Sequence, residues 1–563
     1  MYTLGINAYV HDACAALVCD GEVVAMAEEE RFDRKKHSGA FPSEAARYCL
    51  ESAGIGPQDL HAVGFYVQPW LYWRMIVNRL RYMPRSLRSA KGASTGSFMS
   101  FLRVRKDLAA AFPGADVSSL SVRFVPHHLC HAASAFLLSG FDEAAILSID
   151  ASGEWATTQY SEGHGRDIKV LQEISFPHSL GILYSAATQY LGFRRQNCEG
   201  KIMGLAPYGE PRYIDTFREI IALHPQGEFR LDLSYFSHQY GEDPWSSPKW
   251  VDAFGPAREW ESEISQVHED VAASLQLRTE EVADHLARHL KEITSQSRLC
   301  LCGGVALNSV MNGKIAASGI FDEIFIQPAA GDAGTGLGAA LWIDAQQNPD
   351  SQPWVQTHAS LGPEYADEEI VAALECYKLE FRREDDICQE AARLLSEGAI
   401  LGWFQGRMEV GPRALGNRSI LADPRSDEMK DILNRKVKHR EPFRPFAPSV
   451  LADRAGDFFT TAQPSPFMLL VCDVKPDKRD VVPAITHVDG TARVQTVERQ
   501  ANPRYYDMIE AFGNLTGVPM VLNTSFNVRG EPIVNSPEDA VKCFMGTGID
   551  YLVIGDFVAT KTS

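Results

Sequence analysis

Two histidines and two aspartates are spaced so that they could bind a metal ion. His127 and His131 lie four residues apart in HHLCHAASAFLL, which predicts a helix with both imidazoles on one face. Asp150 ends the apolar strand AAILSID, and Asp332 stands in the turn GDAGTG after EIFIQP. Such ligands suit a divalent first-row metal, and iron, manganese and zinc all fit by ligand type. By itself, the histidine pair is more often a hydrogen-bonded structural pair.

Three glycine-containing segments could bind a nucleotide. Gly303 and Gly304 precede Asn308, GDAGTG precedes an expected helix over residues 337–345, and EGKIMG places Lys201 beside glycine. Backbone N–H groups at helix starts bind phosphate or ribose. Each segment alone is equally well explained by a strand-to-helix turn, whereas three around one cleft favour a nucleotide.

Cationic residues are concentrated in the last third of the chain. Guanidinium groups match phosphate geometry bidentately. An exposed arginine-rich surface is the alternative, but GPRALG and FRPFAP set arginine among glycine, proline and aromatic residues, which favours an ordered pocket. The cations of this region are Arg413, Arg418, Lys436, Lys438, Arg440, Arg444, Arg493 and Arg529, and Ser525 stands near the last of them.

The elements that must position these residues follow a repeated pattern. Residues 2–30 and 145–174 both contain a strand, a polar loop and a hairpin, which turns at Asp20-Gly21 in the first and near residues 163–165 in the second. This repetition predicts a duplicated α/β fold with a cleft between its halves. Apolar spacing over residues 267–290 predicts a helix, and residues 298–301 a short strand.

Length and composition set the domain organisation. The chain has 563 residues, of which 45% are hydrophobic and 23% charged, as in soluble globular proteins. Its length predicts two or three domains. The polar stretch AQQNPDSQP at residues 345–353 predicts a linker between two parts that could each bury a core.

Charge and cysteine content exclude several classes. The 54 Lys+Arg and 73 Asp+Glu give a net charge of −19, which argues against a nucleic-acid partner but leaves anionic ligands open. The 11 cysteines are scattered without CxxC pairing, so reduced thiols in a cytoplasmic enzyme fit better than disulfides or structural zinc. The sequence shows neither a signal peptide nor an apolar run long enough to span a membrane.

Two further segments each allow two interpretations. Residues 70–106 contain nine Lys/Arg and no Asp or Glu. They predict either a solvated insertion whose arginines pair with acidic neighbours, or a patch for an acceptor or an anionic surface. Residues 229–260 are aromatic, and these side chains either line an acceptor pocket or pack in a core.

Motifs along nearly the whole chain resemble those of the O-carbamoyltransferase family, which includes the nodulation-factor, aminoglycoside, cephalosporin and aminocoumarin carbamoyltransferases. The resemblance implies a duplicated actin-like (ASKHA) domain over residues 1–344 with a variable insertion at 66–120. It further implies a linker at 345–360 and a YrdC-like α/β domain over 361–563. The motifs are HDACAAL, EEERFDRKKH, HHLCHAASA, EGKIMGLAPYG, CGGVALN, PAAGDAGTGLGAAL, GRMEVGPRALGNRSILADPR, FRPFAPSVL and LNTSFNVRGEPIV.

The same resemblance implies an ATP-dependent enzyme. Its C-terminal domain would form carbamoyl-adenylate from carbamoyl phosphate and ATP with Mg²⁺. Its N-terminal domain would pass the carbamoyl group to a hydroxyl of a small-molecule natural product at an Fe²⁺ site, with manganese or zinc as alternatives. The residues implied are His11 as the catalytic group; His127, His131, Asp150 and Asp332 as metal ligands; Lys36, Lys201, Gly303, Gly304 and Asn308 at the adenylate; and Arg413, Arg418, Lys436, Arg444, Arg493, Ser525 and Arg529 at carbamoyl phosphate and ATP.

Three other functions remain as alternatives. A phosphotransferase of the actin-like superfamily would release ADP rather than AMP and pyrophosphate. Carbamoylation of tRNA conflicts with the charge of −19, although residues 70–106 are basic. An actin-like scaffold has no use for two histidines and two carboxylates around a metal. The sequence leaves the acceptor and the oligomeric state open, and residues 66–120 and 226–262 are the segments expected to select the acceptor.

Overall fold

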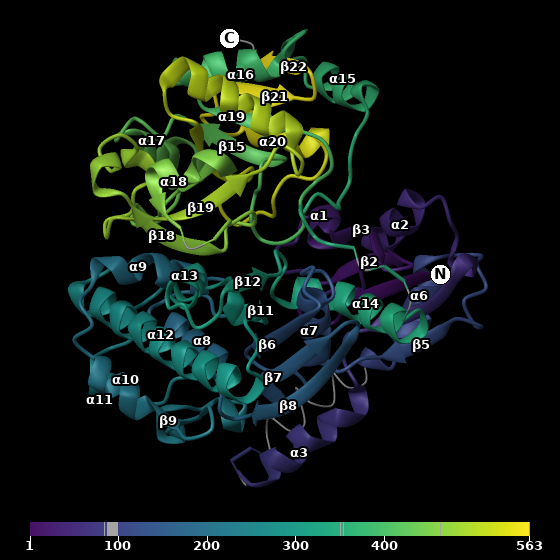
Figure 1. Cartoon of the computed structure of the whole chain (residues 1–563), viewed down its shortest axis with the longest axis vertical. Helices are drawn as coiled ribbons and strands as arrows, with labels where there is room; N and C mark the ends of the chain where they lie inside the picture. Colours follow the sequence, from purple (N-terminus) through teal and green to yellow (C-terminus); the bar gives the residue numbers. More distant parts are fainter. Residues whose placement is uncertain (84, 87–99, 350, 353, 462, 562–563) are drawn as a thin grey trace. The chain divides into compact units, whose positions relative to one another are not determined.

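The structure is a computed structural model that describes residues 1–83, 85–86, 100–349, 351–352, 354–461 and 463–561 (Figure 1). It forms two compact units, Met1–Glu29 with His37–Val355, and Glu30–Lys36 with Gln356–Ser563. The division after Val355 lies inside the expected linker of residues 345–360, whose first three residues are still helical. The short segment Glu30–Lys36 joins the second unit because Arg31 donates to Gly411 O (2.9 Å) and Arg34 to Ile533 O (2.7 Å).

The first unit contains the same five-stranded sheet twice, in the orders β3-β2-β1-β4-β5 and β8-β7-β6-β11-β12. In each sheet the first three strands are antiparallel and the last two continue in parallel. The duplicated α/β fold predicted from the sequence is therefore confirmed. The strands are β1 (Tyr2–Asn7), β2 (Cys14–Cys19), β3 (Glu22–Glu28), β4 (Leu60–Phe65), β5 (Ser121–Phe124), β6 (Glu143–Ile149), β7 (Ala156–His164), β8 (Asp167–Ser175), β11 (Arg298–Cys302) and β12 (Glu323–Ile326).

Local sequence explains these strands. The middle strand of each sheet, β1 (YTLGIN) and β6 (EAAILSI), is apolar and buried along nearly its whole length, as expected for a strand covered on both faces. The first hairpin turns at Asp20 and Gly21, whose φ angles of 50° and 88° match a turn with two left-handed residues. The second hairpin turns after His164 at Gly165, as predicted.

Helix α14 (Thr335–Gln347) packs against β1, β2 and α7 (His127–Phe136) at very short range. A Cβ atom on Gly338 would lie 1.8 Å from Cys130 O, and one on Gly5 would lie 1.8 Å from Gly336 O. These glycines are therefore required for packing. The other main helices of this unit are α2 (Ser43–Ser52), α3 (Tyr72–Leu80), α6 (Val104–Ala111), α8 (Leu180–Tyr190), α9 (Glu199–Leu205), α10 (Ile214–Ile220), α11 (Lys249–Phe254), α12 (Gln266–Thr294) and α13 (Ser309–Ala317).

The two segments with open interpretations are partly settled by their contacts. In the basic segment, Arg85 pairs with Glu242 (2.9 Å) and Arg103 with Asp107 (3.6 Å), as expected of a solvated insertion. Arg88 and Lys91 lie outside the described residues. In the aromatic segment, Trp250 is fully buried and its ring packs on Phe254 (5.3 Å), which favours packing there. Within the described ranges, no helix is long and apolar enough to cross a membrane.

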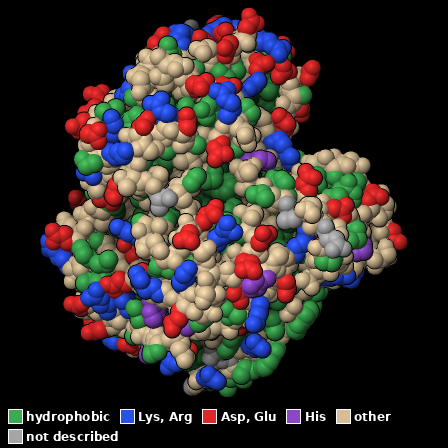
Figure 2. Space-filling model, in the orientation of Figure 1, with side chains coloured by type: hydrophobic (Ala, Val, Ile, Leu, Met, Phe, Trp, Pro, Cys, Tyr) green, Lys and Arg blue, Asp and Glu red, His purple; other side chains and the backbone are tan. Residues whose placement is uncertain are grey.

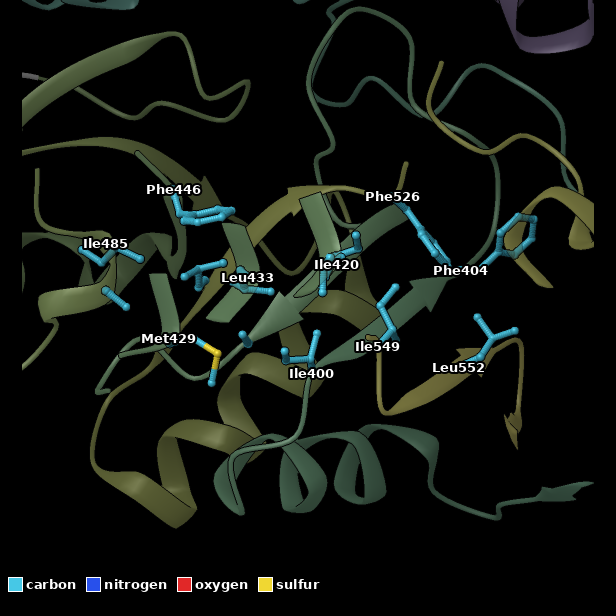
Figure 3. Packing of buried hydrophobic residues seen from close by; sticks show 14 of the residues in the cluster. Ile400, Phe404, Ile420, Met429, Leu433, Phe446, Ile485, Phe526, Ile549 and Leu552 are labelled. Carbon is cyan, nitrogen blue, oxygen red and sulfur yellow. The ribbon is translucent and has the colours of Figure 1, made fainter. Parts of the chain in front are cut away.

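The second unit is built on one ten-stranded mixed sheet in the order β13-β22-β21-β14-β15-β20-β16-β19-β18-β17. Neighbouring residues of its central strands face opposite cores: Phe404 and Ile420 pack in one cluster (Figure 3), and Trp403 and Leu421 in the other. The strands are β13 (Glu380–Arg383), β14 (Leu401–Phe404), β15 (Arg418–Ala422), β16 (Ala447–Leu451), β17 (Phe459–Thr460), β18 (Leu470–Val474), β19 (Thr491–Val497), β20 (Met520–Ser525), β21 (Tyr551–Ile554) and β22 (Phe557–Thr560).

Helices of this unit pack in pairs. α16 (Ile387–Ser396) packs on α19 (Pro503–Thr516), and α15 (Asp367–Cys376) on α20 (Pro537–Met545). α17 (Met429–Leu433) runs directly into a π-helical turn over Asn434–Lys438, which is followed by His439 with a φ of 46°. This irregular turn sets the direction of the basic side chains after residue 434.

Candidate functional site

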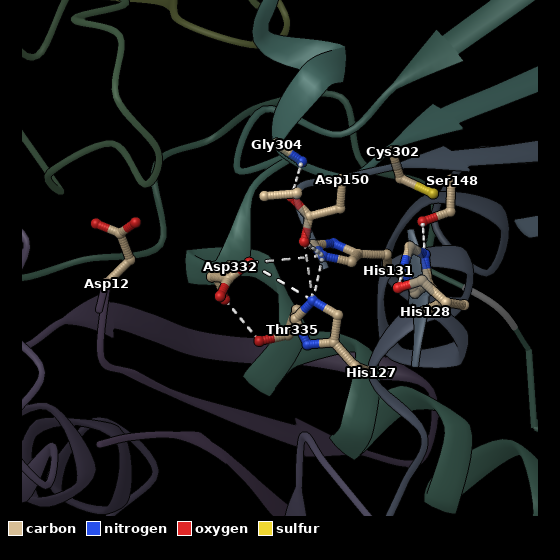
Figure 4. Close-up of polar contacts among 12 residues, drawn as sticks. Asp12, His127, His128, His131, Ser148, Asp150, Cys302, Gly304, Asp332 and Thr335 are labelled. Atoms are coloured by element: carbon tan, nitrogen blue, oxygen red, sulfur yellow. Dashed lines mark hydrogen bonds and ion pairs between the residues drawn. The ribbon is translucent and has the colours of Figure 1, made fainter. Parts of the chain in front are cut away.

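The four predicted metal ligands come together in the first unit (Figure 4). His127 Nε2 lies 3.1 Å from His131 Nε2 and 3.1 Å from Asp150 Oδ2. Asp332 Oδ1 lies 3.7 Å from the Nε2 atom of each histidine. The helix α7 begins at His127, whose backbone N–H donates to both carboxylate oxygens of buried Glu154 (3.2 Å). The predicted helix and the two strand-end aspartates therefore meet as the sequence indicated.

This donor set fits a divalent cation. One atom from each of the four side chains lies within 4.8 Å of the others, and all four residues are buried. Burial alone would raise the pKa of Asp150, but hydrogen bonds from His127 and His131 hold it well below its usual range. Burial would lower the pKa of His131, yet Asp150 and Asp332 raise it to about 9. The two carboxylates thus favour a positive charge in this site, which a bound divalent cation would supply.

His128, which is next to His127 in the sequence, has a different role from the four proposed ligands. It lies on the same helix, but Nδ1 is 2.8 Å from Ser148 Oγ and Nε2 is 2.9 Å from Ala156 O. Burial, together with the charge of His127, lowers its pKa to about 3. His128 is a neutral structural histidine that ties α7 to strands β6 and β7.

His11 lies beside the four-residue cluster and is held by Asp12. His11 Nδ1 is 3.0 Å from Asp12 Oδ2, and the other Asp12 oxygen is 2.7 Å from His37 Nδ1. His11 Nε2 faces Asp332 Oδ2 at 3.7 Å. Burial alone would lower the pKa of His11, but the charge of Asp332 and the hydrogen bond to Asp12 raise it to about 10. The imidazole is thus oriented through one nitrogen and presents the other toward the cluster.

Asn7 is a site residue that the sequence reasoning missed. Its fully buried amide donates to Asp12 O (3.0 Å), His11 O (3.3 Å) and Asp332 O (2.9 Å). This one side chain therefore joins the loop after β1 to the turn before α14. A polar amide at the end of the apolar strand YTLGIN was the available signal.

The predicted nucleotide residues have different surroundings. Gly304 N donates to Asp150 Oδ1 (3.2 Å). Gly303 has a φ of 88°, and a Cβ atom at this position would lie only 2.2 Å from Ile149 O, so no other residue fits there. Asn308 caps α13 by accepting from Met311 N (3.1 Å). Lys201 is half-buried on α9, with Nζ 5.1 Å from the centre of the Phe193 ring. Lys36 belongs to the second unit.

A cluster of cations lies in the second unit. Burial and the charge of Arg444 lower the pKa of Arg413 to about 10. Burial and Arg444 lower that of Arg440 to about 9. Burial lowers the pKa of Arg493 strongly, with further effects from Arg413, Arg440 and Arg444. The buried Nε of Arg493 has no acceptor among the described residues. Four neighbouring guanidinium groups of like charge are suited to a polyphosphate anion.

Lys438, rather than Lys436, occupies the buried position beside this cluster. Lys436 is exposed, whereas Lys438 is buried, and its Nζ donates to Asn527 Oδ1 (3.0 Å) and Ser525 Oγ (3.3 Å). Burial and the charge of Arg440 lower the pKa of Lys438 well below its usual range, and Lys36 adds to the effect. The π-helical turn over Asn434–Lys438 decides which lysine points inward, and sequence periodicity could not show it.

Two other predicted phosphate residues are placed differently. Arg418 is fully buried in β15, donates to Gln405 O (2.7 Å), Gly406 O (3.0 Å) and Pro363 O (3.1 Å), and stacks on Phe404. Its guanidinium holds the backbone around residue 406. Arg529 is 44% exposed and lies 4.0 Å from Glu441 Oε1.

Comparison with known proteins gives consistent matches over the chain. The family described as Carbamoyltransferase N-terminus matches residues 2–341, and Carbamoyltransferase C-terminus matches residues 392–561. Nodulation protein NolNO of Sinorhizobium fredii is 41% identical over 99% of this chain and 80% of its own length. Nodulation protein NolO of Bradyrhizobium diazoefficiens is 44% identical over 77% of this chain and 78% of its own. The uncharacterized protein sll1178 of Synechocystis is 45% identical over 100% of this chain and 97% of its own.

Proposed function

Because this chain belongs to the carbamoyltransferase family, we propose that it is an ATP-dependent O-carbamoyltransferase acting on a hydroxyl of a small-molecule natural product. The second unit, as a YrdC-like domain, would form carbamoyl-adenylate from carbamoyl phosphate, water and ATP with Mg²⁺, and would release inorganic phosphate and pyrophosphate. The first unit would then transfer the carbamoyl group. The observation that carries this proposal is the cluster of two histidines and two aspartates with His11 beside it.

The cation cluster supports the activation step. Arg413, Arg444 and Arg493 would neutralise the phosphates of carbamoyl phosphate and ATP, because partly buried guanidinium groups interact strongly with anions. Arg440 and Lys438 are included in this proposal because both lie close to Arg444. We further propose that Lys436, Ser525 and Arg529 contact these substrates at the edge of the cluster, and that Arg418 maintains the backbone around residue 406.

His11 supports the transfer step. Its Nδ1 is held by Asp12, and the charge of Asp332 raises the pKa of the ring while no cation is bound. A cation held by Asp332 would offset that charge, so Nε2 could then accept the proton of the acceptor hydroxyl as its oxygen attacks the carbamoyl carbon and AMP leaves. A divalent metal held by His127, His131, Asp150 and Asp332 would act as a Lewis acid that polarises the carbamoyl carbonyl. Fe²⁺ is proposed, with Mn²⁺ or Zn²⁺ as alternatives. We also propose that Lys36, Lys201, Gly303, Gly304 and Asn308 contact the adenylate.

The acceptor would lie against the segment 66–120. Within it, the Tyr66 ring packs 5.6 Å from the His127 ring, so this segment reaches the proposed metal site. The adenylate and the metal site use residues outside the segment. Changes in residues 66–120 would therefore alter the choice of hydroxyl without altering activation.

One assay separates this function from its alternatives. The purified chain is incubated with carbamoyl phosphate, labelled ATP and Fe²⁺, with parallel samples containing Mn²⁺ or Zn²⁺ and controls lacking carbamoyl phosphate. We expect AMP and pyrophosphate that depend on carbamoyl phosphate. ADP as the only nucleotide product would instead show a phosphotransferase. Carbamoylation of added tRNA, but of no small hydroxyl compound, would show the tRNA reaction.

A further inference from the structure

Helix α3 exposes an apolar face to solvent. Trp73, Val77 and Leu80 are 56%, 45% and 53% exposed, and their spacing of four and three residues places them on one side of the helix. Trp70, which is 54% exposed, precedes the helix. Figure 2 shows hydrophobic side chains gathered at the lower edge of the molecule, where Figure 1 draws α3. Apolar groups gathered in this way mark an interaction site more often than isolated exposed ones do.

The other side of the helix already has its packing partners. The Tyr72 ring lies 5.3 Å from the Phe101 ring, and Met75 is only 8% exposed. The helix is thus held to the first unit through Tyr72 and Met75. The exposed side chains of Trp73, Val77 and Leu80 are left for a partner outside the unit.

The surroundings of this face are basic. Arg74 and Arg81 are exposed beside it, and residues 70–106 carry nine Lys/Arg and no Asp or Glu, although the whole chain has a net charge of −19. Arg85 is already paired with Glu242 and stacks on Tyr240, so it contributes less of this charge. The charge of this stretch of sequence is therefore opposite in sign to the net charge of the chain, although Glu173 lies close enough to Arg74 to interact with it electrostatically.

This combination fits one kind of partner. Indole rings prefer the interface between lipid headgroups and acyl chains, short apolar side chains insert below it, and arginines attract anionic headgroups. A second copy of the chain that docked through the same face would bring two basic segments together, and their like charges would repel. We propose that Trp70, Trp73, Val77 and Leu80, flanked by Arg74 and Arg81, form a surface that docks on anionic lipid bilayers.

The test uses the purified full chain and sedimentation with vesicles. One set contains phosphatidylcholine alone, and the other phosphatidylcholine mixed with phosphatidylglycerol. We expect the chain to sediment with the mixed vesicles and to be released as salt rises. Trp73→Glu should reduce binding to the level of the neutral vesicles. Arg74→Ala and Arg81→Ala should each weaken binding by about fivefold, the effect of one basic residue near an anionic surface.

The matched control is Trp260→Glu. Trp260 is 52% exposed, like the α3 tryptophans, but lies outside the basic segment, so this variant should bind as the wild type does. The melting temperatures of all variants show whether they are folded. The proposal is overturned if the wild type sediments with neither vesicle, or if Trp73→Glu binds mixed vesicles normally. It is equally overturned if the wild type does not sediment with vesicles but forms a dimer that Trp73→Glu disrupts, since a second copy of the chain then covers this face.

Discussion

His11 and Asp332 face each other, with His11 Nε2 3.7 Å from Asp332 Oδ2. The other oxygen of this carboxylate points toward His127 and His131, at 3.7 Å from each Nε2. One side chain therefore joins the proposed base to the proposed metal ligands. Asn7 fixes the relation by donating to the backbone oxygens of both residues. A change at Asp332 should disturb the metal and the base together.

Replacing Asp332 should separate the two half-reactions. In Asp332→Asn we expect loss of bound metal and loss of acceptor carbamoylation, because a charged ligand is removed, while pyrophosphate release in the second unit continues. Metal analysis and a pyrophosphate assay check this. His128→Ala is the control, since His128 is buried nearby but bonds to Ser148 and Ala156. It should keep the metal and lose about 1–3 kcal/mol of stability. Full metal content in Asp332→Asn would contradict the assignment.

Asp12 should act by positioning His11. Asp12→Asn keeps the size of the side chain but removes the charge that His11 Nδ1 and His37 Nδ1 face. We expect kcat for carbamoyl transfer to fall by about a hundredfold or more, by analogy with other carboxylates that orient a catalytic histidine. KM for the acceptor and the rate of pyrophosphate release should change little. A loss that is confined to KM would instead assign Asp12 to acceptor binding.

The second unit offers a contrast between two arginines. Arg493→Ala should abolish pyrophosphate release and leave the melting temperature of the ligand-free protein unchanged or higher, because one of four mutually repelling charges is removed. Arg418→Ala should destabilise the protein by about 3 kcal/mol or more, since its guanidinium holds several buried carbonyl groups. Urea unfolding and the pyrophosphate assay measure both effects. A stable, inactive Arg418→Ala would return Arg418 to the phosphate site.

His487 should make stability depend on pH. Burial, with a further effect of Arg493, lowers its pKa to about 4, whereas an unfolded histidine has a pKa of about 6.5. Between these values the unfolded chain binds a proton that the folded chain does not, so the stabilisation is full above pH 6.5 and is lost as the pH falls toward 4. The effect is at most on the order of 3 kcal/mol. In His487→Gln, the free energy of unfolding should fall less steeply over this window, and parallel curves for both proteins would refute the prediction.

Much of the first unit could be predicted from the sequence, because the signals there are local. Apolar strands that end at polar loops placed Asp150 and Asp332 at strand ends, and a spacing of four placed His127 and His131 on one helix face. The repeated hairpin pattern predicted the duplicated sheets. Strand and helix periods fix the direction of a side chain over a few residues, so these inferences needed no long-range contacts.

Only the tertiary structure decided the positions that depend on irregular backbone or distant partners. A π-helical turn directs Lys438 inward instead of Lys436. The guanidinium of Arg418 donates to Pro363 O, 55 residues away in the sequence. Asn7 joins two loops that are far apart in sequence. Side-chain direction in such places is set by packing and by hydrogen bonds between residues distant in the sequence. Helix and strand periodicity therefore does not predict it. The sequence by itself determined which residues could bind a metal or a phosphate or act as a base, and the fold decided which of them face one another.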